Sequence, residues 1–267
     1  MANDEEIINP MVICSVDDSS QYLEVRDTPW NDAVLGWRTC EVIDFCSEES
    51  AFEIIFQRAI EFINSSGYTY VQARIEHNRV KRQAVERAGF YFAELSYQLS
   101  FHNPCQYKYS NKLRKQILLM PVESQEDINF IKKTARDGFH YGRLLEDINI
   151  NIDFARKRTE NWIDTLLQSP NELLLAKHGS KPIGFHAQRA SFESGEIDWL
   201  LTGTVSDCSM LSVPLWHSAF ILAQDRKFKC IKTMVSAANV GVLNLYNTFP
   251  FRVDRSLCGY HLFLNRE

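Results

Sequence analysis

The chain has 267 residues, of which 45% are hydrophobic and 24% charged, a composition typical of a globular protein with a substantial core. Its formal net charge of −5 argues against broad nucleic-acid binding, which needs a basic surface to displace counterions. The acidic start MANDEEII lacks the apolar segment of a signal peptide. No apolar run approaches the roughly 18–20 residues that span a bilayer, so we expect no membrane partner.

Cysteine usage indicates the compartment. The seven cysteines are an odd number, contain no CxxC pair and have no paired histidines nearby. This pattern is typical of a reducing cytoplasm and predicts neither a disulfide framework nor a metal site.

The N-terminal part begins with an irregular entry, residues 1–37, that contains short strands such as 11–16 and an aromatic turn at Pro29 and Trp30. Alternating β-formers predict a strand at 39–45. Helical spacing of apolar residues predicts a helix at 48–64, with Ser47 as its N-cap. A strand at 68–75, a helix at 79–88 and a long strand at 90–101 complete this part.

Residues 102–113 are polar and without period, which is typical of a linker. Beyond them the patterns predict a strand at 115–122, a helix at 124–138 capped by Ser124, an irregular loop FHYGRLLEDINI, and a helix at 153–168. Strands at 173–177, 183–190 and 197–204 follow. A helix at 211–226, a strand at 229–236, a short helix after Asn239 and a strand at 252–264 end the chain. We therefore predict two domains, 1–105 and 106–267.

A repeat supports this division. The stretch from Phe56 to Phe90 reappears as His217 to Phe251, 161 residues later, as helix, strand, Asn, helix, aromatic and strand. Each Asn precedes its Phe by twelve residues. Repeated units of this size indicate a duplicated α/β fold, and a residue needed for chemistry need occur in only one copy.

The second half resembles the Gcn5-related N-acetyltransferase (GNAT) superfamily. The resemblance rests on residues 239–246, NVGVLNLY, followed by Phe249, Pro250 and Phe251. The whole chain looks most like bacterial acetyltransferases of nucleotide-linked amino sugars, of the TDP-fucosamine acetyltransferase type. The Pro29–Trp30 pair, the Glu76-His77-Asn78 run and the FHYGRLLEDINI loop carry that narrower likeness.

The resemblance implies an α/β (α+β) fold of tandem GNAT-like mixed sheets, with a partial N-terminal unit before a complete C-terminal one. It also implies an N-acetyltransferase that moves an acetyl group from acetyl-CoA to a small-molecule amine acceptor. A homodimer is expected as a further arrangement of such proteins.

Tyr246 is the candidate general acid for the departing thiolate. It lies seven residues after Asn239, two helical turns, so both can face one cleft. The equivalent residue in the first copy is Val85, which transfers no proton. A tyrosine packed in the core, with its hydroxyl bonded to a carbonyl group, is the alternative.

Asn239 has two interpretations as well. Asn is a preferred helix N-cap, and Asn78 occupies the same place in the first copy, while a cofactor contact is implied only by the resemblance. The family's phosphate loop carries glycines, whereas residues 206–214 read SDCSMLSVP. Ser209 and Ser212 can still bond phosphate, but Asp207 would repel an anion.

The strand before that loop carries the candidate base. Strand alternation places Glu196, Asp198, Leu200 and Thr202 on one face and Ile197, Trp199 and Leu201 on the other. Several GNAT enzymes keep a carboxylate base here, which singles out Asp198, with a solvated edge carboxylate as the alternative. Cofactor contacts are expected from the following residues: Leu200, Thr202, Ser209, Ser212, Asn239 and Tyr246.

The acceptor site is expected at Arg143, Tyr141, Trp199 and His261. A diphosphate acceptor needs cations, and Arg143 lies in a glycine-bearing loop among aromatic residues. His261 is a second candidate base or an exposed strand residue. Two other functions stay open: a degenerate, non-catalytic binding or scaffold module, and an acyltransferase that uses an acyl carrier protein as donor.

Overall fold

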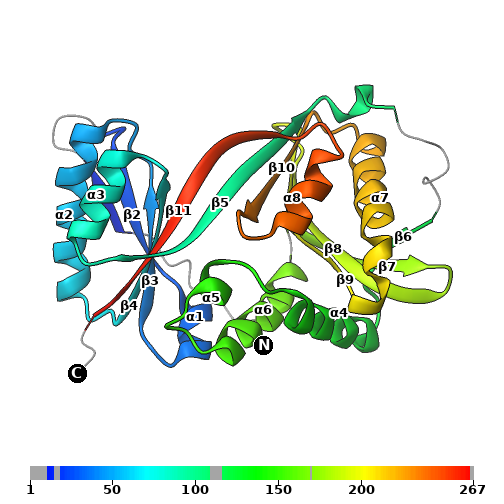
Figure 1. The fold of residues 1–267 in the computed structure, drawn as a ribbon, viewed down its shortest axis with the longest axis horizontal. Helices are drawn as coiled ribbons and strands as arrows, with labels where there is room; N and C mark the ends of the chain where they lie inside the picture. Colours follow the sequence, from blue (N-terminus) through cyan, green and yellow to red (C-terminus); the bar gives the residue numbers. More distant parts are fainter. Residues whose placement is uncertain (1–10, 15–18, 109–115, 169, 265–267) are drawn as a thin grey trace. The chain divides into compact units, whose positions relative to one another are not determined.

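The computed structural model describes residues 11–14, 19–108, 116–168 and 170–264 (Figure 1). The chain divides into two compact units. The first unit combines Met1–Ser96 with Arg255–Glu267, and the second unit is Tyr97–Asp254. Each unit is a mixed sheet with helices, so the predicted α/β (α+β) class is confirmed.

The first unit contains three helices and six strands in its described part. Its elements are β1 (Met11–Cys14), β2 (Tyr22–Asp27), α1 (Pro29–Leu35), β3 (Thr39–Asp44), α2 (Glu49–Ser65), β4 (Tyr70–Glu76), α3 (Arg79–Arg87), the start of β5 (Tyr91–His102) and most of β11 (Arg252–Phe263). The strand order is β1-β2-β3-β4-β11-β5, with β3 and β4 parallel and β4 and β11 antiparallel.

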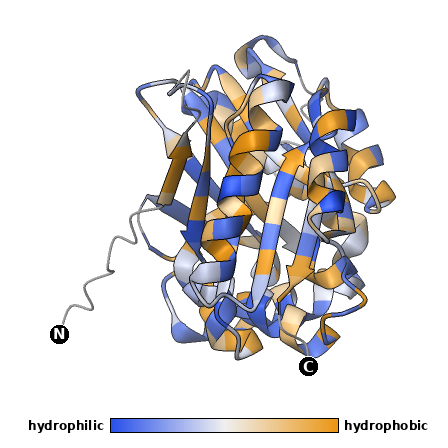
Figure 2. Cartoon of the chain, turned by 90° about the vertical axis from the view of Figure 1, so that its left-hand side faces the viewer, coloured by the Kyte–Doolittle hydropathy of each residue, from blue (hydrophilic) through white to orange (hydrophobic). Residues whose placement is uncertain are grey.

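Helices α2 and α3 cover one face of this sheet because their apolar residues recur at helical spacing. Phe52 and Phe56 of α2 pack against Val71 and Ile75 of β4 and against Tyr260 of β11. Figure 2 shows hydrophobic and hydrophilic residues alternating along these elements, as two-sided burial requires.

Two local predictions in this unit are wrong. Helix α2 is capped by Glu48 without a side-chain bond, because Ser47 bonds Gln21 instead. The aromatic turn at Pro29 and Trp30 is helix α1, which Pro29 starts at its first position, where its missing N–H costs no helical bond.

The second unit has the strand order β5-β10-β9-β8-β7-β6. Its elements are η1 (Pro104–Gln106), β6 (Leu118–Pro121), α4 (Gln125–Gly138), α5 (Arg143–Glu146), α6 (Ile152–Leu166), β7 (Asn171–His178), β8 (Lys181–Ser191), β9 (Glu196–Thr204), η2 (Ser206–Leu211), α7 (Ser212–Asp225), β10 (Cys230–Ser236) and α8 (Val240–Asn247). The predicted irregular loop thus contains α5, and the predicted helix at 211–226 is preceded by the 3₁₀ segment η2.

Two cores lie on opposite faces of the second sheet. Helices α7 and α8 pack on one face through residues such as Phe220 and Leu245, and we call this side the α7/α8 face. Helices α4 and α6 pack on the other through residues such as Ile131 and Ile163, the α4/α6 face. No described helix is long and apolar enough to cross a membrane.

The predicted repeat is confirmed as an order of elements. Helix α2, strand β4, helix α3 and strand β5 correspond to α7, β10, α8 and β11, and β5 and β11 begin 161 residues apart. Asn78 and Asn239 each accept a backbone N–H at the start of the following helix.

The last strands of the two copies are exchanged. Strand β11 of the second copy pairs with β4 of the first, whereas β5 of the first copy lies beside β10 of the second. The expected domains 1–105 and 106–267 are consecutive segments, but residues from Arg255 onward cluster with the first unit. Residues 102–108 of the predicted linker carry the end of β5 and η1, and residues 109–115 lie outside the described part.

Candidate functional site

Strands β9 and β10 separate at their carboxyl ends. They pair in parallel only from Glu196 with Cys230 to Trp199 with Thr233, yet β9 continues to Thr204 and β10 to Ser236. Parallel strands that part company at their carboxyl ends leave a crevice where ligands bind in α/β sheets. We call this place the strand opening.

A β-bulge at Leu200 marks the point of separation. Along β8, Ala187 pairs with Leu201 and Gln188 with Trp199, which leaves Leu200 without a partner on either neighbouring strand. A bulge bends its strand and frees backbone groups. The backbone of Leu200 is therefore available at the strand opening, as a cofactor contact would require.

The bulge also overturns one sequence expectation. The Oγ1 atom of Thr202 lies 2.8 Å from Nδ1 of His186, on the α7/α8 face together with Trp199. Simple alternation had placed Thr202 opposite Trp199. Leu201 packs with the α4/α6 core instead of with Trp199, because the extra residue inverts the alternation after position 200.

His186 anchors a chain of buried polar groups. Its Nε2 atom lies 3.0 Å from Oε1 of Gln188, whose amide donates to Glu172 at 2.7 Å. Glu172 in turn accepts two bonds from Arg226 at 2.5 and 2.7 Å. Arg226 holds the pKa of Glu172 below its usual value, whereas burial lowers the pKa of His186 to about 4.

The buried His186 makes stability depend on pH. Its folded-state pKa of about 4 lies below the ordinary 6.5, so the unfolded chain binds the proton more readily. The stability present above pH 6.5 is lost as the pH falls toward 4, about 3 kcal/mol in total and about 2 kcal/mol between pH 7 and pH 5. Denaturant unfolding followed by tryptophan fluorescence should show this loss.

The matched variants are His186→Gln and His178→Gln, the latter at an exposed turn residue. We expect His186→Gln to be less stable at pH 7 and to lose less stability between pH 7 and pH 5 than the wild type. His178→Gln should keep the wild-type dependence. Equal pH slopes in all three proteins would contradict a neutral, buried His186.

Tyr246 lies at the base of the strand opening on the α7/α8 face. Its ring is 5% exposed and packs on Phe251 at 4.9 Å between ring centroids. Its hydroxyl lies 3.3 Å from Oγ1 of Thr233, which donates to the carbonyl oxygen of Trp199 at 3.1 Å. Burial raises the pKa of Tyr246, which keeps the hydroxyl protonated as a general acid requires.

Helix starts surround the strand opening, since η2 follows β9 and α8 follows β10. Asn239 caps α8 by accepting from the N–H of Val242 at 3.2 Å, so its helix-capping role is established. Ser212 starts α7 with its Oγ 3.2 Å from Oγ1 of Thr204, while Ser209 is exposed in η2. These hydroxyl groups and first-turn amides are the local donors for an anion.

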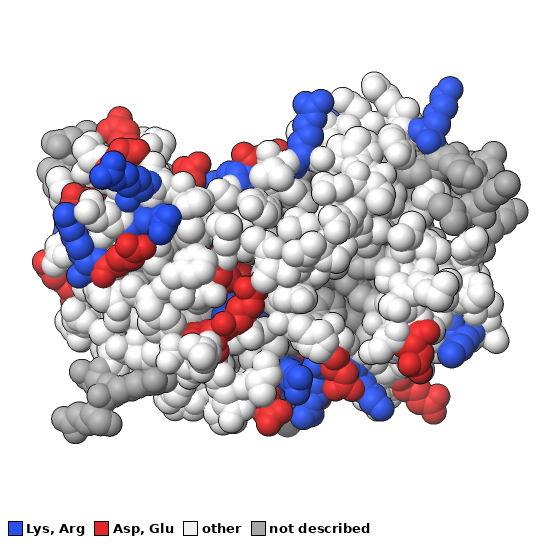
Figure 3. All heavy atoms as spheres, viewed as in Figure 1, with Lys and Arg blue, Asp and Glu red and all other residues white. Residues whose placement is uncertain are grey.

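Cations are missing from this segment of the sequence. Neither residues 200–225 nor residues 233–251 contain a Lys or Arg. In Figure 3 charged side chains gather over α2 and α3 and over α4 and α6, whereas the part of this face formed by α7 and α8 is nearly uncharged. Phosphate groups at the strand opening would depend on backbone and hydroxyl donors alone.

Exposed apolar side chains take the place of cations. Met210 is 92% exposed and Val240 is 59% exposed, and Val213 and Met234 are also exposed. All four lie on η2, α7, β10 or α8, at the ends of these elements nearest the strand opening. We call them the apolar rim.

The opposite face of the sheet carries charges. Asp198 forms an ion pair with Arg189 at 3.1 Å, and Glu196 forms one with Lys232 at 2.7 Å. Asp198 therefore lies on the α4/α6 face, directly before the strands separate, with its carboxylate already accepting from a cation. This arrangement suits attraction of an ammonium group better than uptake of its proton.

The residues expected at the acceptor are not all brought together. Tyr141 is 44% exposed and Arg143 begins α5, both in the second unit. Trp199 is 3% exposed and packs in the α7/α8 core, so it offers no open surface. His261 is fully buried in the first unit, where Tyr70 bonds its Nδ1 at 2.8 Å, and it is no exposed strand residue.

The first unit lacks the strand opening. Its parallel strands β3 and β4 pair from Thr39 with Tyr70 to Ile43 with Arg74, nearly to the end of both strands. Lys81, which corresponds to Val242, is buried there and pairs with Asp44 at 2.6 Å. An internal cation thus fills the region that stays open in the second unit.

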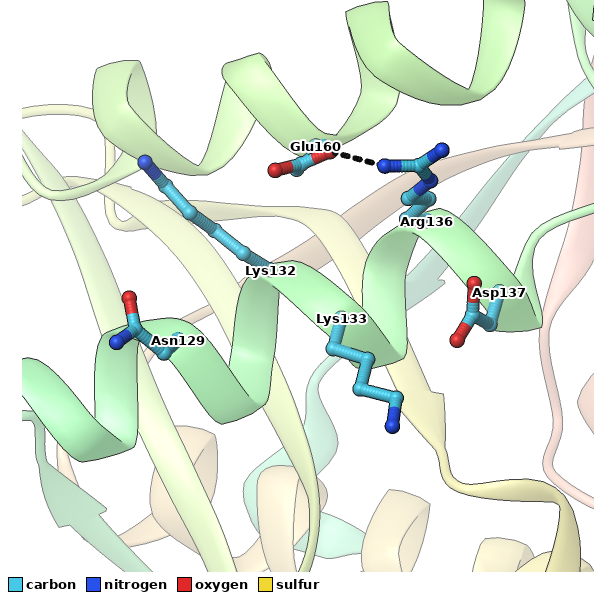
Figure 4. A pocket seen from close by; sticks show the side chains of 6 residues that line it. All are labelled: Asn129, Lys132, Lys133, Arg136, Asp137 and Glu160. Atoms are coloured by element: carbon cyan, nitrogen blue, oxygen red, sulfur yellow. Dashed lines mark hydrogen bonds and ion pairs between the residues drawn. The ribbon is translucent and has the colours of Figure 1, made fainter. Parts of the chain in front are cut away.

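A concave patch of about 460 Å³ lies elsewhere on the second unit, against α4 and α6. Its charged groups are largely paired with each other: Figure 4 shows Arg136 facing Glu160, which it contacts at 3.4 Å. None of the predicted site residues lines it, so we assign it no ligand. No described group of three or more His, Cys, Asp or Glu residues could hold a metal ion.

The sequence patterns missed His186 and Thr233. Both stand in strands whose alternation reads as ordinary sheet, and only the bulge brings His186 to Thr202. Thr233 was detectable in principle, because it is a polar residue between the buried Ile231 and Val235.

Comparisons with known proteins match the fold. No protein-family model matches the chain, and no curated protein is similar in sequence. A GCN5-related N-acetyltransferase from Sphaerobacter thermophilus superposes with a TM-score of 0.67 at 12% identity, covering 96% of this chain and 81% of that one. A tandem GNAT protein from the clavulanic acid biosynthesis pathway gives 0.57 at 9% identity, covering 95% and 82%.

The chain has the tandem GNAT fold. A functionally unknown conserved protein from Staphylococcus epidermidis shares it, with a TM-score of 0.64 at 10% identity over 99% of this chain and 98% of that one. In this tandem GNAT fold, the strand opening, the bulge and Tyr246 all belong to the second unit.

Proposed function

We propose that the second unit is an N-acyltransferase that takes an acyl thioester at the strand opening and passes the acyl group to an amine. One observation carries this proposal: β9 and β10 separate above the Tyr246 hydroxyl, while the equivalent strands β3 and β4 stay paired. The GNAT-type neighbours support the same reaction class.

The residues present fit an acyl thioester in part. The unpaired backbone of Leu200 can bond the polar groups of the donor, and the apolar rim can pack against its aliphatic portion. Tyr246 gives its proton to the departing thiolate, and Thr233 orients the hydroxyl. Ser209, Ser212 and the first-turn amides are the phosphate donors for acetyl-CoA, since this segment has no cation.

The acceptor in this proposal is a small amine, with a nucleotide-linked amino sugar as its most specific form. Arg143 supplies a guanidinium for a diphosphate, and Tyr141 an exposed ring for a base or sugar. Asp198 attracts the ammonium group from the α4/α6 face.

Acetyl-CoA should stabilise the protein, because a ligand at one hundred times its Kd adds about 2.7 kcal/mol. We expect a rise in Tm with acetyl-CoA and heat of binding in calorimetry. Val240→Asp places a carboxylate on the apolar rim at the start of α8 and should weaken binding by repelling phosphate.

Val253→Asp is the matched control, because Val253 is also 59% exposed but lies on β11. It should leave the affinity unchanged. Equal affinity in both variants would move the donor away from the strand opening, and no binding by the wild type would contradict acetyl-CoA as donor.

The missing cations and loop glycines favour a second candidate, in which the unit is a binding or scaffold module that no longer catalyses. An acyl carrier protein as donor is the remaining variant, since its thioester arm needs fewer phosphate contacts. Binding of an acyl carrier protein without binding of acetyl-CoA would select that variant, and binding of neither would select the scaffold.

A further inference from the structure

A serine, a histidine and an aspartate lie together on the sheet of the second unit, apart from Tyr246. The Oγ atom of Ser100 donates to Oδ1 of Asp254 at 2.7 Å and lies 3.3 Å from Nε2 of His102. Ser100 is 1% exposed, whereas His102 and Asp254 are exposed. We call these three residues the Ser100 cluster.

The hydrogen bonds fix the tautomer of His102. A hydroxyl group has one proton, and Ser100 gives it to the carboxylate, which can only accept. Toward His102 the hydroxyl oxygen must therefore accept, so Nε2 carries the imidazole proton. The Nδ1 atom is left with a free lone pair and has no partner within the described part of the chain.

The Ser100 cluster occupies the α4/α6 face. Leu99 and Phe101 of β5 belong to the α7/α8 core, so Ser100 and His102 point to the other side. The strand order puts β5 beside β10, and the N–H of Asn103 donates to the carbonyl group of Lys229 at 2.7 Å. The cluster thus shares its face with Asp198.

The charges around the cluster are close to one another and unbalanced. The buried thiol of Cys230 senses the charges of Lys232, Glu196, Asp254 and Asp198, which places them around one region of the sheet. Asp198 and Glu196 have cation partners, whereas Asp254 has none within the described residues. With Arg189 included, three carboxylates face two cations, and the excess negative charge attracts a cation.

We propose that the Ser100 cluster binds the ammonium group of the acceptor and removes its proton, an inference that rests on the proposed function. Asp254 holds the ammonium through its free oxygen, and Nδ1 of His102 takes one proton. The imidazolium that forms is stabilised by Asp254 through Ser100. Ser100 itself is no nucleophile, because it is buried and bonded to a carboxylate instead of to a base.

The reaction balances with the groups named. The freed amine attacks the thioester carbonyl, so that a C–N bond forms and the C–S bond breaks. The thiolate takes the hydroxyl proton of Tyr246, and the surplus proton of the new amide nitrogen restores Tyr246 through water. His102 returns its proton to solvent, so one proton is released for each amide formed.

The test uses the full chain with acetyl-CoA and glucosamine as probes, thiol release for turnover, and calorimetry for donor binding. His102→Gln keeps a donor toward Ser100 but removes the base, and should lower kcat by about 10²–10⁴-fold. Asp254→Asn should mainly raise KM for glucosamine. His102→Ala should regain turnover when free imidazole is added, which a structural role for His102 would not produce.

Both side chains are exposed, so these substitutions should spare the fold, and acetyl-CoA should bind all variants equally. The controls His178→Gln and Asp164→Asn should match the wild type. Turnover at the control level in His102→Gln and Asp254→Asn would overturn the inference. So would a wild type that binds acetyl-CoA but releases no thiol with glucosamine, or imidazole-independent loss confined to Asp198→Asn. A wild type that binds no acetyl-CoA removes the proposed function and this inference with it.

Discussion

A chain that ends after Asp254 should lose the ordered first unit and keep the second. Residues Leu257–Phe263 of β11 pair with Glu76–Tyr70 of β4, and Cys258, Tyr260 and His261 of this strand are buried in the first unit. Removing one large buried side chain costs about 3–5 kcal/mol, so losing a core strand exceeds the roughly 5–15 kcal/mol that stabilises a domain.

Hydrogen exchange measures the two units separately in the same sample. Peptides from β4 should lose protection, whereas peptides from β8 and β9 should keep it. A chain that ends after Leu264 is the control, because it removes only residues beyond the described part, and it should behave as the full chain. Protected β4 peptides in the chain ending after Asp254 would show that β11 is dispensable for the first unit.

Tyr246→Phe should lower kcat and kcat/KM together by about 10²–10⁴-fold, because the proton reaches the thiolate only in the transition state. The substitution keeps the ring against Phe251 and Trp199 and removes one bond to Thr233. We expect a loss of only about 1 kcal/mol in stability, the usual net value of one hydrogen bond. Thiol release and thermal unfolding measure the two quantities.

Tyr260→Phe makes the same chemical change at a buried tyrosine of the first unit, whose hydroxyl bonds Glu86 and Arg82. It should affect stability and leave turnover intact. Wild-type turnover in Tyr246→Phe would assign Tyr246 to core packing alone and leave the donor side without an acid.

Much of the fold could be predicted because its signals are local. Asn78 and Asn239 were recognisable as helix caps, and both cap in the structure. The repeat of helix, strand, helix and strand followed from spacing and turn residues, because each element is specified by its own hydrophobic period.

The candidate site was less predictable because it depends on a bulge and on distant pairings. One extra residue at Leu200 moves Thr202 to the other face, and no composition signal marks it. His261 follows the end of the repeat closely in sequence, but pairing of β11 with β4 places it in the first unit. Which strand a terminal strand will join is a long-range choice that local pattern does not contain.

The exchanged terminal strands also set the order of events during synthesis. When Ser96 has left the ribosome, the first unit still lacks the strand that lies beside β4. At translation rates of about 5–20 residues per second, the missing strand arrives on the order of ten seconds or more later, after the whole second unit. Through that interval the nascent chain presents an unpaired, partly apolar edge, so chaperone occupancy should peak before the last strand emerges. The N-terminal half is made first and completed last.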